Sequence, residues 1–419
     1  MKSFPAPVRP ASGLLRTRNF ALLWTGQSTS AVGSAMTTVA LPLVAVTTLQ
    51  AGPAMVALLT AATWLPWLLI GLPVGVWVDR WPRRRTLLIA DLASAAVLAA
   101  VPIAAWTDVL TMPVLLVAAL LAGTAGVFAN VAFNAYLPHL VGADDLMEGN
   151  AKLQTSASVA LVVGPGLGGL LAQAAGPVSG ILIDAGTFLV SAACLLGLRP
   201  APEPRPAAGD RPGMLRQIAD GIRFIMRGRL LQAMLVVAAV TNFAMLGITA
   251  LRVVFLVRAE GTPPGTAGLV IGVGSLGAIL GAALASRASR RFGSARTYLL
   301  ANLAAAPFVL LLPLGGHGWR LSLFTAGSFI ALAGATMSNV MTMTFRGTFV
   351  PAHLLGRVTA ASRIFVFGTV PLGAATAGLL ASTLGIRPAM WALAALYVLA
   401  PLPLLTTETR TLRDFPTQN

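Results

Sequence analysis

The sequence predicts an all-α polytopic membrane protein, built from about twelve transmembrane helices in two related six-helix halves. Two observations carry this prediction. First, 56% of the 419 residues are hydrophobic and only 10% are charged, whereas charged residues make up about a quarter of an ordinary soluble domain. Second, the hydrophobic residues form long runs separated by short polar segments. A soluble fold could not bury that much apolar surface, but a bilayer surrounds it with an apolar solvent.

The apolar runs define the predicted membrane spans. A helix needs about 20 apolar residues to cross the hydrocarbon core. Gly and Pro occupy the tightest turns between runs, as at Gly52-Pro53 and Gly176-Pro177. The twelve predicted spans are 20–46, 54–78, 86–106, 112–135, 151–173, 177–198, 230–256, 266–286, 297–315, 320–345, 363–383 and 388–406.

The net charge of +16 would indicate a nucleic-acid partner in a soluble protein. Here the basic residues lie in short clusters between apolar runs, so we interpret them as topogenic charge and expect no nucleic acid. With both termini in the cytoplasm, 25 of the 29 Lys and Arg residues fall in cytoplasmic segments. The positive-inside rule therefore predicts cytoplasmic termini, in a cell membrane of the bacterial inner or plasma type.

The second half of the chain repeats motifs of the first. After spans two and eight stand Asp79-Arg80-x-x-Arg83-Arg84 and Ser286-Arg287-x-x-Arg290-Arg291, and spans five and eleven contain Gly164-Pro165 and Val370-Pro371. Six spans repeated in one orientation is a plan used for alternating access. We therefore expect an N-terminal six-helix bundle over 1–198, a cytoplasmic linker over 199–229 and a C-terminal six-helix bundle over 230–419.

The linker has two parts. Residues 199–213 are rich in Pro and polar, which excludes a helix there. In 214–227 the apolar residues fall on one helical face and the charged residues on the other. This pattern predicts an amphipathic helix on the cytoplasmic membrane surface. A plain extension of span seven is the alternative.

Four stretches occur in order along these spans. They are Asn19-Phe20-x-x-Leu23-Trp24-x-Gly26-Gln27; Gly75-Val76-Trp77-Val78-Asp79-Arg80-Trp81-Pro82-Arg83-Arg84; Phe128 to Gly169, with Asn134, Pro138 and Gly164-Pro165-Gly166; and Pro351 to Gly378, with Gly356-Arg357-Val358 and Pro371-Leu372-Gly373. With them the chain resembles the major facilitator superfamily over almost its whole length. Within it, the chain is similar to the drug and siderophore exporters, which include macrolide efflux and enterobactin export proteins.

The second stretch departs from the superfamily's signature loop at Trp77 and Pro82. An Asp at a helix end can accept hydrogen bonds from the free N–H groups at a neighbouring helix N-terminus. The resemblance implies that Asp79 meets span eleven, beginning near Ser362, and closes a cytoplasmic gate. The residues assigned to the gate are Asp79, Arg80, Arg83, Arg84, Arg287, Arg290, Arg291 and Arg357. The alternative is that the arginines only set topology.

Span five carries a Gly-Pro motif, with Gly164, Pro165, Gly168 and Gly169. Pro165 removes a backbone hydrogen bond and lets a helix bend, and glycines let another helix approach closely. In the family this motif is associated with exporters, so we expect a hinge. Generic packing glycines are the alternative.

Charges inside a membrane are costly and are functional candidates. Asp91 in span three, Asp184 in span six and Arg252 in span seven are three such residues. We expect Asp184 to be the proton carrier, with Arg252 at a similar depth as its partner in one state, and Asp91 to be the second candidate. The alternatives are a structural Asp184–Arg252 pair and an Asp91 that pairs with the nearby arginine cluster. Ser34 stands where many relatives carry an acid, so span one offers no carrier.

The family plan implies a central cavity lined by spans one, four, seven and ten. These spans offer Gln27, Ser30, Asn130, Asn134, Asn242, Phe243, Met245 and Asn339. Hydrogen-bonding groups among Met and Phe suit a small amphiphilic organic molecule.

Several chemistries have no signal in the sequence. The GxxxxGK[ST] loop is absent, so ATP is not expected to drive the protein directly, and HExxH and GxSxG are absent as well. The lone Cys194 excludes an intrachain disulfide and a thiol metal cluster. We expect no cofactor and no enzyme activity.

Together these features predict a secondary active exporter of organic compounds. It would work by proton antiport as a monomer among membrane lipids. One alternative is a dedicated exporter of a single endogenous metabolite, such as a siderophore or an antibiotic. Alternatives of other classes are a lipid flippase or scramblase and a membrane sensor that has lost transport.

Overall fold

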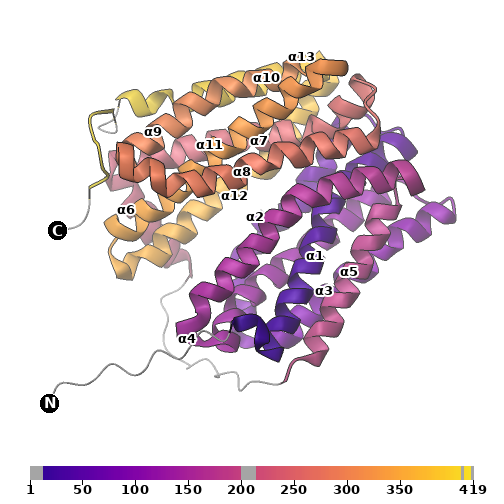
Figure 1. Ribbon diagram of the computed structural model, residues 1–419, viewed down its shortest axis with the longest axis horizontal. Coiled ribbons are helices and arrows are strands. Elements are labelled where there is room, and N and C mark those ends of the chain that lie inside the picture. Colours follow the sequence, from indigo (N-terminus) through magenta and orange to yellow (C-terminus); the bar gives the residue numbers. More distant parts are fainter. Residues whose placement is uncertain (1–12, 200–213, 407–409, 417–419) are drawn as a thin grey trace.

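The computed structural model describes residues 13–199, 214–406 and 410–416, and these ranges contain helices and no strand (Figure 1). The α-helices are α1 (Arg18–Leu43), α2 (Pro53–Arg80), α3 (Arg83–Trp106), α4 (Met112–Ala175), α5 (Ser179–Gly197), α6 (Met214–Arg227), α7 (Arg229–Val253), α8 (Pro264–Phe292), α9 (Ser294–Ala305), α10 (Leu311–Leu314), α11 (Leu321–Phe349), α12 (Ala352–Leu384) and α13 (Ile386–Leu399). Two π-helices, η2 (Val44–Thr48) and η3 (Val254–Ala259), continue α1 and α7. Short 3-10 turns are η1 (Leu14–Arg16), η4 (Ala306–Leu310), η5 (Gly318–Arg320) and η6 (Leu402–Thr406).

The predicted fold class is confirmed. In the described chain, 12 helical segments are long and apolar enough to cross a membrane. Each overlaps one predicted span. Most are longer than predicted, because an apolar run marks only the part of a helix that lies in hydrocarbon.

Helix α4 contains the fourth and fifth spans. They are separated at Gly142, whose φ of 76° and ψ of 170° lie outside the helical region. Glycine has no Cβ and takes this positive φ without strain. The sequence placed a polar connection at 136–150, but the helices continue to Gly142 and resume at Asp144.

The eleventh span begins earlier than predicted. Helix α12 starts at Ala352, directly after Pro351, so Ser362 lies buried within the helix and not at its N-terminus. The expected start near Ser362 is therefore wrong. Polar residues such as Arg357 hid this first part of the helix from a search for apolar runs, although Pro351 is a typical helix-start signal.

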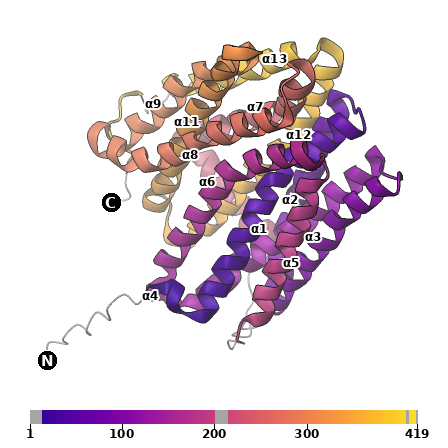
Figure 2. The ribbon, with the colours of Figure 1, turned by 45° about the vertical axis from the view of Figure 1, so that its right-hand side comes forward.

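The helices form two bundles, which we call the N-half (α1–α5) and the C-half (α7–α13). Figures 1 and 2 show them converging at the end that carries η2, η3 and the start of α13, and diverging toward the end that carries α6. We call these the distal end and the linker end.

Small residues bring the two halves together. A Cβ on Gly268 of α8 would collide with the carbonyl oxygen of Pro165, and one on Gly272 would collide with that of Val162. Helix α4 therefore meets α8 backbone to backbone. Helices α2 and α12 also pack closely. Gly378 of α12 lies beside Ala54 and Ala57 of α2, and a Cβ on Gly368 would lie 3.2 Å from Leu68.

The distal ends of α1 and α7 share an unusual backbone course. In both, a π-helical turn leads to a residue with positive φ, which is Gln50 (49°) or Gly261 (61°), and then to a helix that begins with proline. The amide of Ala51 donates to Ala45, and that of Thr262 donates to Leu256. The two segments are therefore structurally equivalent at a fixed sequence offset.

Helix α6 is separate from α7, because Gly228 between them has extended dihedral angles. It packs against α12, where a Cβ on Gly221 would collide with the carbonyl oxygen of Arg357. Ile225 is buried in the C-half. Part of the predicted apolar face therefore meets protein, and the alternative of a plain extension of span seven is wrong.

Candidate transport site

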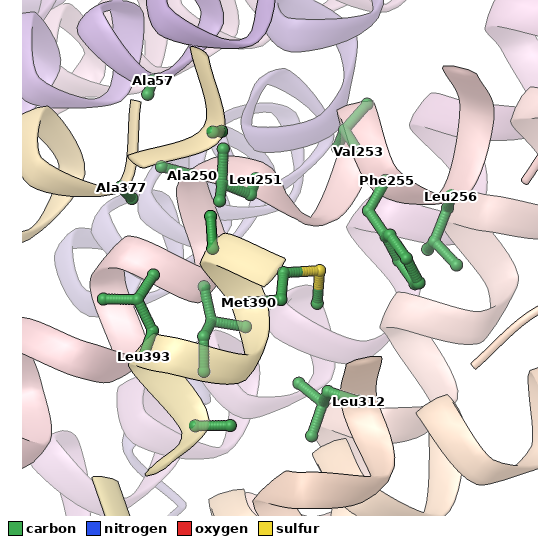
Figure 3. Close-up of a cluster of buried hydrophobic side chains, with 14 of the residues drawn as sticks. Ala57, Ala250, Leu251, Val253, Phe255, Leu256, Leu312, Ala377, Met390 and Leu393 are labelled. Carbon is green, nitrogen blue, oxygen red and sulfur yellow. The ribbon is translucent and has the colours of Figure 1, made fainter. Parts of the chain in front are cut away.

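Side chains of both halves form a sealed apolar cluster at the distal end. Leu43 of α1 and Ala57 of α2 pack with Leu251 of α7 and Leu256 of η3, all fully buried. Figure 3 shows Leu251 between Ala57 and Met390 of α13. We call this cluster the distal plug. Close-packed apolar side chains leave no path for water or a polar solute.

Hydrogen bonds between the halves reinforce the plug. Nη1 of Arg258 donates to the carbonyl oxygen of Ala51 at 2.7 Å. The amide of Gly265 donates to Oε1 of Gln173 at 3.0 Å. Arg258 and Gln173 were not singled out from the sequence, since neither belongs to a motif.

The Gly-Pro motif of the fifth span lies between α1 and α8. A Cβ on Gly168 would come within 2.8 Å of the carbonyl oxygen of Met36, and one on Gly164 would collide with Ala35. Gly169 faces the other way, toward Pro264 and Gly268. The helix keeps helical dihedral angles at Pro165. The structure thus shows that the glycines of this motif pack closely against α1 and α8. The hinge at Pro165 stays a prediction.

The predicted gate residues lie at the linker end of both halves. Arg84 donates to the carbonyl oxygens of Leu195 and Leu196 at the end of α5, at 2.9 Å each. Arg357 pairs with Asp220 of α6 at 2.9 Å. Both therefore have partners within their own halves. Arg80, Arg287, Arg290 and Arg291 are exposed, and Asp79 and Arg83 are half-buried.

Asp184 is buried where α5 meets α1, and its carboxylate joins the two helices. Oδ2 accepts a hydrogen bond from Thr37 of α1 at 2.6 Å, and Oδ1 accepts one from Thr187 at 3.1 Å. Gly33 makes room for this group, because a Cβ there would collide with both Asp184 and Thr187. The anticipated ion pair with Arg252 is not formed in this structure.

Asp91 of α3 is also buried, 2% exposed, and it lies beside Ser191 of α5. Its Oδ2 has no hydrogen-bond partner in the described part of the chain. The alternative that it pairs with the arginine cluster finds no support, because Ser191 is its polar neighbour.

Arg252 stands near the distal end of α7 and is half-buried. Within the described ranges it has no hydrogen bond and no ion pair. Its side chain is only partly covered by protein.

The predicted cavity residues differ in their surroundings. Asn130, Asn134 and Asn339 are exposed, and Gln27, Asn242 and Met245 are half-buried. An exposed amide midway along a membrane helix indicates a water-facing surface, because lipid offers it no hydrogen bonds. Ser30 is almost buried and donates to the carbonyl oxygen of Gln27 at 3.3 Å.

Phe243 is half-buried and packs against the same apolar cluster as Met245. Its backbone touches Gly373 of α12, where a Cβ would collide with the Phe243 carbonyl oxygen. This side of α7 faces the interior of the C-half. The sequence could not show which face of α7 packs on α12, since apolar residues occur on every face.

A charged cluster at the distal end was missed by sequence reasoning. Arg387 of α13 donates to Oε1 of buried Glu260 at 2.5 Å and to the carbonyl oxygen of Gly315 at 3.1 Å. Nδ1 of His317 lies 3.6 Å from Oε2 of Glu260. The three side chains come from three separate parts of the chain, the end of η3, the residue before η5 and the start of α13, so no spacing in the sequence could reveal them.

Comparison with known proteins places this architecture in a family. The chain matches the family described as transmembrane secretion effector over residues 10–415. It is 28% identical over 347 residues to the multidrug efflux pump Tap of Mycobacterium tuberculosis, covering 81% of each chain. It is 26% identical over 383 residues to macrolide efflux protein A of Streptococcus pyogenes, covering 88% of this chain and 90% of that protein.

Solved structures support the fold. The nucleoside transporter NupG has a TM-score of 0.75 at 13% identity, covering 93% of this chain and 99% of that one. A bacterial homologue of the iron transporter ferroportin, in an inward-facing state, has a TM-score of 0.73 at 15% identity, with 94% and 99% covered. The resemblance to drug exporters of the major facilitator superfamily is thus confirmed. The chain is a membrane transporter of this type, not an enzyme, and belongs to the transmembrane secretion effector family.

Proposed function

We propose that this protein is a secondary active exporter of organic compounds that works by proton antiport and alternating access. The names of its relatives support export, because both Tap and macrolide efflux protein A are efflux proteins by name. The bias of 25 of 29 basic residues supports a linker end in the cytoplasm. The distal end then faces outward in a bacterial plasma membrane.

The contacts between the halves support alternating access most directly. The sealed plug and the Arg258–Ala51 hydrogen bond lie at the distal end, while the halves diverge toward the linker end (Figure 2). This arrangement fits a state that is open to the cytoplasm and ready to load substrate. Rocking of one half against the other would open the distal end and close the linker end.

The gate residues fit the second half of this cycle. Helix α12 begins directly after Pro351, so its free N–H groups lie at the linker end. When the linker ends approach, the carboxylate of Asp79 would accept hydrogen bonds from these groups. Arg84 and Arg357 would keep their present partners and hold the ends of α5 and α6 in place. In this account Asp79 acts only in the closed gate.

Asp184 is the proposed proton carrier. Its carboxylate is buried in the membrane interior and binds Thr37 of α1, a helix that also contributes Leu43 to the plug. If opening the plug also shifts α1 against α5 within the N-half, the Thr37 hydrogen bond is lost. The carboxylate's affinity for protons would then change with the access state, which antiport requires. Asp79 and Asp184 both belong to the N-half, Asp79 at the end of α2 and Asp184 in the first part of α5.

The test is transport by purified protein in liposomes with an imposed pH gradient. We expect a panel of amphiphilic compounds to contain some that move against their gradient and release protons. Asp184→Asn should still bind such a compound, but it should neither concentrate it nor move protons. Asp145→Asn, which neutralises an exposed linker-end acid, is the matched control. If Asp184→Asn transports like the wild type, Asp184 is not the carrier.

A further inference from the structure

Arg252 is a membrane-embedded charge without a counterion in the described structure. A cationic side chain at membrane depth is costly and normally pairs with an acid or backbone carbonyl. The guanidinium has neither in this state, and it stays charged at any physiological pH. Something outside the described chain must therefore neutralise it, or water must solvate it.

Among the described residues, the buried acids Asp184, Asp91 and Glu260 do not pair with Arg252. Asp184 is held by Thr37 and Thr187, and Asp91 lies beside Ser191, both inside the N-half. Glu260, eight residues beyond Arg252, is paired with Arg387 and has His317 beside it.

The position of Arg252 on α7 points away from the interior of the C-half. Phe243, whose backbone touches α12, is nine residues earlier, about two and a half turns, so the two residues lie on opposite faces. Met245 is seven residues earlier, about two turns, and shares the face of Arg252. Helix α7 also contacts α1 and α2 of the N-half. The guanidinium therefore faces the space between the halves.

The position of Arg252 along α7 also places it beside the distal plug. The residues on either side of it, Ala250 and Leu251 before and Val253 after, are fully or almost fully buried in the distal plug. Arg252 thus lies at the level of the distal plug, where a route from the linker end would stop. The polar side chains assigned to the cavity, among them Asn130, Asn242 and Asn339, are all uncharged.

We infer that Arg252 anchors the transported compound, and that the substrates are amphiphilic organic anions, in which a carboxylate, phosphate or sulfonate group meets the guanidinium. Arginine binds such groups through two parallel N–H bonds and is more weakly hydrated than lysine, so it suits a partly desolvated anion site. The half-buried Met245 on the same face can meet the apolar body of the ligand. This inference rests on the proposed transport function and names its substrate class.

The test is binding of two xanthene dyes of similar size and opposite charge to purified protein in phosphatidylcholine nanodiscs. The dyes are carboxyfluorescein, an anion, and rhodamine 6G, a cation, followed by fluorescence anisotropy. We expect the wild type to prefer carboxyfluorescein. Arg252→Gln should weaken its binding about tenfold, which corresponds to about 1.4 kcal/mol, and leave rhodamine 6G binding unchanged or tighter.

Two variants make the result specific. Arg252→Lys keeps the charge but loses the paired N–H geometry, so it should retain part of the carboxyfluorescein affinity. Arg296→Gln removes an equal charge from the exposed start of α9 and should bind like the wild type. Gel filtration and thermal melting identify any variant that fails to fold. If Arg252→Gln does not fold, carboxyfluorescein binding is compared between the wild type and Arg252→Lys.

Four results would overturn the inference, and three of them concern dye binding in phosphatidylcholine alone. They are preference of the wild type for rhodamine 6G, absence of carboxyfluorescein binding, and equal carboxyfluorescein binding by folded wild type and Arg252→Gln. A fourth is loss of carboxyfluorescein binding when phosphatidylglycerol is added, because a lipid headgroup would then hold the site. Failure of the export proposal looks different: carboxyfluorescein would bind through Arg252 but would not be moved in liposomes.

Discussion

The N-half and the C-half share a backbone plan but carry opposite charges in the membrane. The segments Val44–Thr48 and Val254–Ala259 end in the same hydrogen-bond pattern, with Ala51–Ala45 matched by Thr262–Leu256. Yet the N-half buries Asp91 and Asp184, whereas α7 of the C-half holds Arg252. The repeated backbone therefore allows the two halves to move against each other. The charges differ in their proposed roles, since the N-half acids handle protons and Arg252 of the C-half binds substrate.

The offset between the equivalent segments pairs Arg252 with Leu41. Leu41 is buried in the apolar cluster of the N-half that also contains Ala40 and Val44. The same helix position is therefore sealed in one half and reaches accessible space in the other. This contrast yields the prediction with the largest expected effect.

Leu41→Arg should destroy the folded protein. It would place an unpaired charge in a sealed apolar cluster, at a penalty of several kcal/mol. We expect no monodisperse protein by gel filtration, whereas Leu41→Met should behave like the wild type. Arg252→Leu should melt at the wild-type temperature or above, because a functional charge adds no stability. A stable Leu41→Arg variant or an unfolded Arg252→Leu variant would contradict the claim that position 41 is sealed and position 252 is not.

Asp184→Asn should abolish proton-coupled transport with little loss of folded protein. The amide keeps the size of the carboxyl group and can still accept a hydrogen bond from Thr37. Proton movement is measured with a pH-sensitive dye in liposomes. Asp91→Asn serves as the comparison within the N-half and should retain at least half of the coupled rate. Equal losses in both variants would mean that the two acids act as a unit.

The signature loops should differ in their effect on stability. Arg84→Gln loses two charge-assisted hydrogen bonds to the end of α5, which we expect to lower stability by about 1–3 kcal/mol. Arg291→Gln changes an exposed residue of the C-half loop and should stay within about 0.5 kcal/mol. Thermal melting in detergent measures both. Equal shifts would show that both loops only set topology.

Arg258→Gln should have the smallest effect, seen as a shift between access states. It removes the hydrogen bond to Ala51 across the distal end, a contact of about 1 kcal/mol. We expect faster labelling of a cysteine introduced at Leu43, after replacement of Cys194 by serine. Thr47→Val, which removes only a bond within the N-half to Leu43, is the control. Unchanged labelling would show that the plug alone holds the distal end.

The sequence predicted the spans well because the signal for a membrane helix is local. Runs such as 86–106 need no tertiary information, and α3 covers Arg83–Trp106. The start of α12 was missed because its first turns are amphipathic. The kink at Gly142 was missed because one residue with unusual dihedral angles leaves little trace in hydropathy.

The site was predictable only as a set of candidates. Asp184 and Arg252 were recognisable as charges in apolar runs, but whether they pair depends on how α5 and α7 are oriented. The roles of Thr37 and Gly33 required the contact between α1 and α5, which joins residues about 150 positions apart.

Alternating access requires reciprocal movement of the two ends, and one distance measurement tests this movement most directly. Spin labels at Trp81 and Phe292 report on the linker end, and labels at Met55 and Leu384 report on the distal end; all four residues are exposed. The distances between the labels are measured by pulsed electron paramagnetic resonance, with and without a saturating transported compound, in protein with Cys194 replaced by serine. We predict that the linker-end distance shortens as the distal distance lengthens. Distances that stay fixed, or that change in the same direction, would contradict alternating access.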